Sequence, residues 1–243
     1  MLAWRSARPI NLSPYAVALS KSRELMSLKS RLIAHSAFPY LAPLAVWALL
    51  SLPDFLDPRV IYLLYPINIF AVGLVMAFQL TRWPPLAPAR PWACVGIGLF
   101  GAAAWIALLP LFPAEVRSPF DPYRFFGPGQ IAGGLTLFRI LGEGVVFPVA
   151  SAVFIYGFLM RFFIRVRFET VPLGEFSIRS AITAVLMTVA FDPGHWPGAL
   201  EAGLVFTVWF LFTRNLGSAV LTGVVAHLAI CAHLLGVHRA DLL

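Results

Sequence analysis

The sequence PVASAVFIYGFLMR, residues 148–161, decides the fold, because it lies inside the longest apolar region of the chain, residues 129–163. That region holds about 35 residues, whereas one membrane-spanning helix needs about 20. Pro148 stands near its middle and has no N–H to donate within a helix. We therefore expect either a kinked, tilted helix or two segments, and we favour a break at Phe147–Pro148.

The composition of the whole chain is that of a membrane protein. Hydrophobic residues make up 60% of the 243 residues and charged residues only 12%, and the mean hydropathy is +0.83. A soluble domain usually carries about 25% charged residues, so this chain must use the lipid bilayer as much of its solvent. The net charge of +7 comes from basic residues that flank apolar spans, which argues against nucleic acid as a partner.

The other apolar segments are separated by polar or proline-rich links. Together with residues 129–163 they predict seven or eight spans, and they cover residues 38–52, 60–80, 92–112, 178–191, 198–212 and 217–237. We therefore predict an all-α fold, a polytopic bundle of transmembrane helices. One transmembrane domain, residues 36–243, accounts for all of these segments.

The first 35 residues form a basic segment of their own, with Arg5, Arg8, Lys21, Arg23, Lys29 and Arg31. Two interpretations fit it: a helix over 13–32 lying on anionic lipid, or a partly disordered cytoplasmic tail. Basic residues also gather in residues 81–91 and in the loop after residue 161. The positive-inside rule then places the N-terminus in the cytoplasm; seven spans place the C-terminus outside and eight place it inside.

Ionisable residues at membrane depth are costly and each merits a functional hypothesis. Arg139 and Glu143 are one helical turn apart and can form an ion pair, which is either structural or part of a site. Asp192 and His195 lie in FDPGHWPG, either as an ordinary interfacial turn or as a site. Glu201 follows, near the start of the next span, where it can project into a cavity with them.

The last span carries His227 at depth, within GVVAHLAICAHLL, and Cys231 lies one turn further on the same face. A second cysteine, Cys94, also lies in an apolar run, so neither residue indicates a disulfide framework. His195, His227 and a carboxylate lack the close ligand spacing of a zinc site. The sequence therefore predicts no metal and no cofactor.

Three strings in the second half resemble one known family: GFLMR at 157–161, FETVPLGEFS at 168–177 and RNLGSAVLTGVVAH at 214–227. Together they resemble the CPBP family of intramembrane proteases, which includes the CAAX-processing and bacteriocin-processing proteases. The greatest similarity is to the CAAX prenyl protease-related proteins of bacterial exosortase and PEP-CTERM sorting systems. The resemblance covers roughly residues 105–237, and it implies a bacterial inner membrane protein with a membrane or lipidated protein as client.

The family's chemistry uses a Glu-Glu pair with a downstream arginine to activate water, and two histidines to position the water or to stabilise an oxyanion. Counted from the GFLMR string, Ser151 and Ala152 stand at the Glu-Glu pair and Tyr156 at the arginine. The Phe-x-x-x-His motif is read at Phe191 to His195, although alignment on Trp196 places Pro193 at the histidine. The last histidine matches His227, with Cys231 at the usual asparagine.

These departures favour a non-catalytic or strongly divergent relative that binds or scaffolds a membrane or lipidated protein. The alternative is an active intramembrane endopeptidase whose carboxylate base is relocated to Glu143, Asp192 or Glu201, beside His195 or His227. On a continuous helix Glu143 lies about 12 Å along the axis and about 80° around it from Ser151. A second alternative is a structural subunit of a membrane complex or a small transporter.

Overall fold

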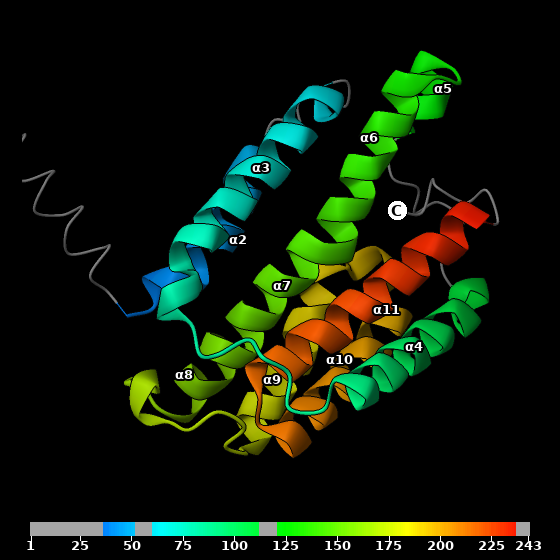
Figure 1. The fold of residues 1–243 in the computed structure, drawn as a ribbon. Helices are drawn as coiled ribbons and strands as arrows, with labels where there is room; N and C mark the ends of the chain where they lie inside the picture. Colours follow the sequence, from blue (N-terminus) through cyan, green and yellow to red (C-terminus); the bar gives the residue numbers. More distant parts are fainter. Residues whose placement is uncertain (1–35, 52–59, 112–120, 237–243) are drawn as a thin grey trace, which may run out of the picture. The chain divides into compact units, whose positions relative to one another are not determined.

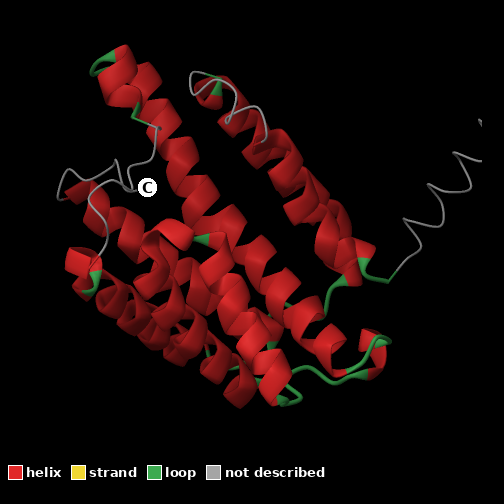
Figure 2. Cartoon of the chain, turned by 180° about the vertical axis from the view of Figure 1, so that it is seen from behind, coloured by secondary structure: helices red, strands yellow, loops and turns green. Residues whose placement is uncertain are grey.

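The computed structural model describes residues 36–51, 60–111 and 121–236, and every regular element within these ranges is a helix (Figure 2). The chain divides into two compact units, Met1–Phe38 and Pro39–Leu243. The predicted surface helix or tail of residues 1–35 lies outside the described residues. All contacts below belong to the second unit.

The described part of the second unit contains seven helical rods (Figure 1). Six of them are single helices: α2 (Phe38–Ser51), α3 (Ile61–Gln79), α4 (Pro91–Ala107), α9 (Ile178–Phe191), α10 (Trp196–Thr213) and α11 (Leu216–Gly236). The remaining rod is composite and consists of α6 (Gln130–Leu141), η4 (Gly142–Val146), α7 (Phe147–Ala152), η5 (Val153–Leu159) and α8 (Met160–Ile164). A short helix, α5 (Pro122–Phe126), precedes it.

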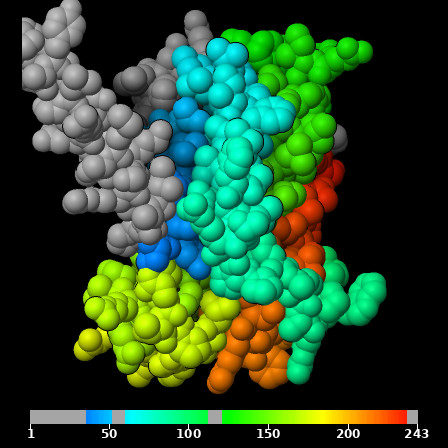
Figure 3. All heavy atoms as spheres, turned by 60° about the vertical axis from the view of Figure 1, so that its left-hand side comes forward, coloured from blue at the N-terminus to red at the C-terminus, as the bar shows by residue number. Residues whose placement is uncertain are grey.

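Four of these stretches are long and apolar enough to cross a membrane: Ile61–Arg82, Gln130–Ile164, Trp196–Thr213 and Leu216–Gly236. The helices α2, α4 and α9 are apolar but shorter. On α3 the side chains of Leu63, Phe70 and Phe78 are 68%, 68% and 73% exposed, and α3 crosses the face seen in Figure 3. A stripe of exposed large apolar residues is unfavourable in water and suits lipid, so the chain fits an integral membrane protein.

The composite rod is continuous from Gln130 to Ile164, so the predicted break at Phe147–Pro148 is wrong. Two wider π-helical turns, η4 and η5, interrupt the α-helical pattern instead. At the first one the Phe147 N–H donates to the carbonyl of Gly142, five residues back. The wide turn directly precedes Pro148, so the missing N–H falls where the helix has already changed its hydrogen-bond pattern.

Small residues allow close crossings between α11 and its neighbours. A Cβ atom on Gly98 of α4 would lie 2.7 Å from the carbonyl oxygen of Thr222, and one on Gly217 would collide with the backbone of Leu86. Glycine at such crossings lets helix backbones approach closely. The helix α11 therefore packs against both α4 and the composite rod, and it forms one wall of the space between them.

The helices α2 and α3 are joined to each other by hydrogen bonds, and α3 packs against the composite rod through apolar side chains. The buried Asn68 of α3 donates from Nδ2 to the Trp47 carbonyl over 3.2 Å and to Ser51 Oγ over 3.0 Å. Trp83 Nε1, just after α3, donates to the carbonyl of Pro39 over 2.9 Å. The α3 residues Ile61, Tyr65 and Ile69 form a buried cluster against Leu135, Phe138 and Val146.

The loop after the composite rod is held by Arg161, the last residue of the GFLMR string. Its guanidinium donates to the carbonyls of Val171 over 2.7 Å, Gly157 over 3.0 Å and Glu169 over 3.2 Å. The same group lies 5.3 Å from the centre of the Phe168 ring. Arg161 therefore folds the FETVPLGEFS segment back onto the end of the rod.

Candidate functional site

A cavity of about 490 Å³ lies among the helices of the second unit. It receives side chains from α2, α3, α4, α9, α10, α11 and the composite rod, and its volume is in the usual range of ligand pockets. Eight of the nine polar residues singled out from the sequence line it: Arg139, Glu143, Ser151, Tyr156, Asp192, His195, His227 and Cys231. Polar residues from distant parts of the chain therefore line the same cavity.

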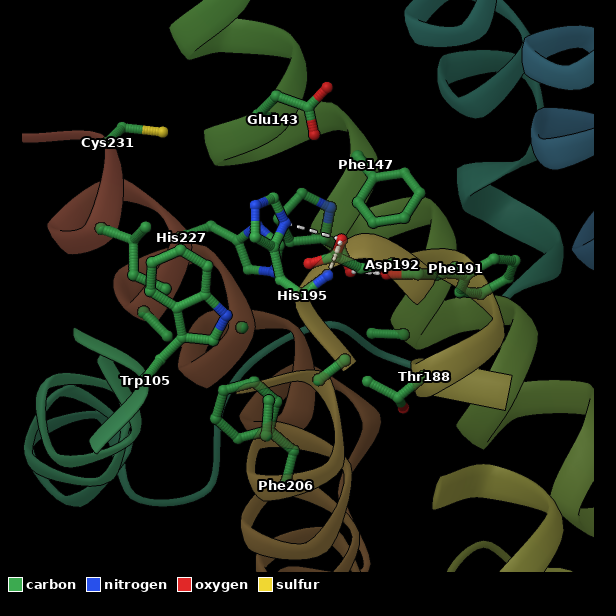
Figure 4. A pocket seen from close by; sticks show the side chains of 18 of the residues that line it. Trp105, Glu143, Phe147, Thr188, Phe191, Asp192, His195, Phe206, His227 and Cys231 are labelled. Atoms are coloured by element: carbon green, nitrogen blue, oxygen red, sulfur yellow. Dashed lines mark hydrogen bonds and ion pairs between the residues drawn. The ribbon is translucent and has the colours of Figure 1, made fainter. Parts of the chain in front are cut away.

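Asp192 and His195 form a carboxylate–histidine pair at this site. Proline and glycine residues turn the chain between α9 and α10, and Asp192 caps this turn by accepting from the backbone N–H of His195 over 3.3 Å. The same oxygen, Oδ1, lies 2.9 Å from His195 Nδ1. The His195 side chain is 12% exposed and the Asp192 side chain 42% exposed. The turn therefore orients one imidazole on the cavity wall (Figure 4).

His227 reaches the same cavity from α11 (Figure 4). Its ring lies near the Glu143 and Asp192 carboxylates, close enough for both charges to act on it. The Phe147 ring packs against it with the ring centres 6.2 Å apart. Both candidate histidines therefore face one cavity, with a carboxylate near each.

Glu143 is shared between two neighbours. Its Oε1 accepts from the Tyr65 hydroxyl over 3.2 Å and lies 3.4 Å from Arg139 Nη1. The Arg139 guanidinium also stacks over the Tyr65 ring, 4.9 Å from its centre. The ion pair expected from the spacing of Arg139 and Glu143 is thus present, and it links the composite rod to α3.

The residues at the three substituted motif positions, Ser151, Ala152 and Tyr156, carry no charged group. Ser151 donates from Oγ to the carbonyl of Pro148 over 3.2 Å. The Tyr156 hydroxyl lies 3.5 Å from Thr207 Oγ1 on α10. Ala152 is buried and carries no polar group. None of these contacts places a carboxylate where the resemblance expects the Glu-Glu pair.

The sequence predicted that Glu201 could project into the cavity, but Glu201 is not among the residues that line it. It lies on α10 beside α4, where a Cβ atom on Gly101 would be 4.0 Å from Glu201 Oε1. Both carboxylate oxygens are buried, and neither has a hydrogen-bond partner among the described residues. The first turns of α10 direct Ala199 and Ala202 to the cavity, whereas Glu201 is not among the lining residues and lies against Gly101 of α4.

Sequence reasoning missed three residues that shape the site: Tyr65, Trp105 and Phe147. The Trp105 ring centre lies 5.6 Å from that of His195, and a Cβ on Gly198 would collide with the Trp105 indole. These residues lie in apolar helices with no motif around them. The only local signal was glycine, because Gly142 and Gly198 each leave room for one of these aromatic rings.

Within residues 36–51, 60–111 and 121–236, no three His, Cys, Asp or Glu side chains lie close enough together to hold a metal ion. Comparisons of the chain with family models, with curated proteins and with solved structures found no match. The resemblance to the CPBP family therefore rests on the sequence motifs.

The arrangement can carry out proton transfer beside an apolar space. A carboxylate that accepts the N–H of an imidazole fixes the tautomer and leaves the other ring nitrogen as a base. With Nδ1 of His195 directed to Asp192, the base is Nε2. Trp105, Phe147 and Phe191 surround these groups with apolar surface, and exclusion of water strengthens the electrostatic interactions inside such a site.

Proposed function

We propose that the chain is an intramembrane hydrolase, a divergent relative of the CPBP endopeptidases that hydrolyses an amide or ester bond in a membrane or lipidated protein. The observation that carries the proposal is the 2.9 Å contact between Asp192 Oδ1 and His195 Nδ1 on the wall of a cavity that His227 also lines. In this proposal Asp192 is the relocated carboxylate, and it acts through His195.

The chemistry follows from the two histidines. A water molecule between them donates one hydrogen to His195 Nε2 and the other to the cavity-facing nitrogen of His227, which directs an oxygen lone pair at the substrate carbonyl. His195 takes the proton as the water attacks, and then delivers it to the leaving nitrogen or oxygen. Asp192 stabilises the imidazolium that forms between these two steps.

The proposed topology is seven crossings of a bacterial inner membrane with the N-terminus in the cytoplasm. Arginines gather at the end of the bundle where α3, α8 and α10 end and where α4, α9 and α11 begin (Figure 1): Arg82, Arg90, Arg161, Arg165, Arg167, Arg179 and Arg214. The bond from Trp83 to Pro39 places the start of α2 at this same end. The positive-inside rule assigns that end to the cytoplasm.

Quantitative sequencing of new protein N-termini tests the hydrolase. Wild type, Asp192→Asn and His195→Gln are expressed at equal levels in the same host membrane, and new N-termini are quantified by mass spectrometry. Loss of a general base or of its orienting carboxylate lowers hydrolysis about 10²- to 10⁴-fold, so the wild-type products should vanish in both variants. The matched control is His233→Gln, because His233 is a histidine of α11 outside the cavity lining. Identical products in all four membranes would exclude the hydrolase.

A non-catalytic client-binding protein is the second candidate. One argument for it is that Tyr65 and Arg139 both bind Oε1 of Glu143, which makes this carboxylate a structural group. A second is that Ser151 and Tyr156 replace charged residues of the family's motif. A photo-crosslinking residue at Ile230, on the cavity wall, and one at the exposed Leu74 of α3 separate the two functions. Binding without cleavage is supported if a client protein crosslinks through position 230 but not through position 74. The crosslinked client should then have its full-length mass both in the wild-type background and in Asp192→Asn.

A further inference from the structure

We infer that the cavity is entered from one end of the bundle, the end opposite the arginines, so that the client presents a segment that lies outside the cytoplasm. The access route follows from the packing of the described residues, 36–51, 60–111 and 121–236. The nature of the client rests on the proposed function, and the side of the membrane rests on the proposed orientation.

At the end opposite the arginines, the cavity lining reaches the ends of four helices. Ser51 is the last residue of α2 and Ile61 is the first residue of α3, and both line the cavity. Asp192 and His195, in the turn between α9 and α10, line it as well. The Asp192 side chain is 42% exposed, so water reaches a carboxylate of the cavity wall at this end.

Toward the arginine-rich end, where α3, α8 and α10 end (Figure 1), the lining stops well before most of the helices do. On four of the rods the lining residues nearest to that end are Gly101, Tyr156, Thr188 and Phe206. The helix rises about 10 Å from Phe206 to Thr213, and about 15 Å separate Thr188 from the start of α9 at Ile178. On α11 the lining comes closer, to Ala219, which is itself 2% exposed.

Buried side chains fill the space below the lining and form the cavity floor, which consists of Tyr156, Thr207, Phe210 and Leu216. The Tyr156 and Phe210 rings pack with their centres 4.7 Å apart, and the Tyr156 hydroxyl lies 3.5 Å from Thr207 Oγ1. Leu216 Cδ2 would be 3.6 Å from a Cβ on Gly157, next to Tyr156. None of the four floor residues is more than 4% exposed.

The links at the arginine-rich end add a second layer beneath the floor. The Ala89 N–H donates to Ser218 Oγ over 3.1 Å, so the link between α3 and α4 lies against the start of α11. A Cβ on Gly174 would be 2.9 Å from Arg214 Cα, which places the loop after the composite rod against the end of α10. The described part of the chain therefore closes the cavity on this side.

The two ends of the bundle thus differ in access. A solute in water reaches the Asp192–His195 pair from the end opposite the arginines, whereas from the arginine-rich end it meets the cavity floor. The positive-inside rule assigns the arginine-rich end to the cytoplasm. A client of the proposed hydrolase would therefore place a segment from outside the cytoplasm beside the pair.

Labelling of single cysteines in sealed membranes tests the access route. Cys94 and Cys231 are replaced by alanine, and Ile230→Cys then reports on the cavity wall. Arg165→Cys marks the arginine-rich end and Tyr123→Cys the opposite end, because both side chains are exposed. A membrane-impermeant methanethiosulfonate is added to right-side-out and to inverted vesicles, and the remaining thiols are measured by a gel shift with a polyethylene glycol maleimide.

Ile230→Cys should react from the same side as Tyr123→Cys. Both should lose their free thiol in right-side-out vesicles and keep it in inverted vesicles, which is the reverse of Arg165→Cys. Reaction of Ile230→Cys in inverted vesicles would overturn the inference, because the reagent would then pass the floor. Failure to react in either preparation would overturn it as well, because the cavity would then be closed at both ends.

Removal of a floor side chain should open the second route. With Phe210→Ala or Tyr156→Ala, Ile230→Cys should also react in inverted vesicles. Phe212→Ala is the matched control, since Phe212 lies on the same helix but is 64% exposed, and it should leave the reaction one-sided. One-sided reaction in both floor variants would show that these rings do not close the cavity.

The labelling requires no turnover, so it is independent of the hydrolase test. If wild type produces no new N-termini, the proposed function fails while the labelling still decides the access route. If wild type is active, its new N-termini should lie in protein segments outside the cytoplasm. New N-termini in cytoplasmic segments would show that the client does not enter from the open end.

Discussion

The Tyr65 hydroxyl donates to Oε1 of Glu143 across 3.2 Å, and it joins α3 to the composite rod at the level of the cavity. Arg139 binds the same oxygen at 3.4 Å, so one carboxylate oxygen serves two partners on two rods. The shared acceptor belongs to a cavity-lining residue, and it also holds α3 against the composite rod.

Tyr65→Phe should lower the free energy of unfolding by about 1–3 kcal/mol, because a buried hydrogen bond to a charged group is lost while the ring stays. Thermal unfolding in one detergent, followed by circular dichroism, measures the change. Tyr123→Phe on α5 is the control, since the Tyr123 side chain is 45% exposed and its variant should stay within about 0.5 kcal/mol of wild type. Equal stability of both variants would show that the Tyr65 bond does not hold α3.

The glycines beside Glu143 should tolerate alanine poorly. A Cβ on Gly142 would collide with the Tyr65 hydroxyl, whereas one on Gly144 would meet the flexible end of Leu228. Overpacking costs about 1–3 kcal/mol, so Gly142→Ala should destabilise more than Gly144→Ala. Gly134→Ala on α6 meets nothing within 4 Å and should stabilise by up to about 1 kcal/mol through helix propensity. Unfolding midpoints of the three variants give the order, and a stabilising Gly142→Ala would contradict the packing.

Asn68→Leu should loosen α2 from α3, since both bonds to Trp47 and Ser51 disappear. Each bond contributes about 0.5–1.5 kcal/mol. Ser51→Ala removes one acceptor and should therefore have about half the effect. Hydrogen exchange of the α2 amides, measured by mass spectrometry, is the readout, with the α9 amides as the internal reference. Unchanged α2 exchange in Asn68→Leu would show that another contact holds the pair.

Arg161→Lys should free the loop of residues 165–177. Lysine keeps the charge but cannot donate to three carbonyls from one planar group, and the Val171, Gly157 and Glu169 carbonyls lose their shared donor. Limited proteolysis should cut this loop about ten times faster in the variant, which corresponds to a local loss of about 1.4 kcal/mol. Arg165→Lys, at an exposed position, should be cut at the wild-type rate.

The apolar runs of the sequence predicted the helices well, but they predicted the contacts between the helices poorly. The predicted segment 178–191 coincides with α9 (Ile178–Phe191), and the predicted segment 217–237 differs from α11 (Leu216–Gly236) by one residue at each end. An apolar run in a membrane becomes a helix because lipid offers no hydrogen-bond partners, so the backbone N–H and C=O groups must bond to each other within the segment. The prediction at Pro148 failed because proline removes one donor, and a wider turn absorbs that loss without ending the helix.

The polar candidates of the site were recognisable, but their partners were not. Arg139 and Glu143 could be paired from their four-residue spacing, and Asp192 with His195 from their shared turn. Tyr65 and Trp105 could not be assigned, because each meets its partner through tertiary packing more than 75 residues along the chain. Glu201 was misplaced since one helical step of 100° separates it from Ala202 on the cavity wall.

The two π-helical turns of the composite rod also determine which changes in chain length this rod can accept. A π-helical turn is equivalent to one extra residue inserted into an α-helix. Deletion of Val145 would therefore allow a regular α-helix across η4, and the rod would remain unbroken. Because the surplus residue and the wide turn that absorbs it would disappear together, the side chains after the deletion would keep their orientation toward α11, whereas a deletion within the α-helical α6 would turn every following side chain by about 100° and shift it by about 1.5 Å. Ser151 and Tyr156 would stay on the cavity wall after the loss of Val145, so the wide turns are the places where this rod can lose one residue without losing its cavity face.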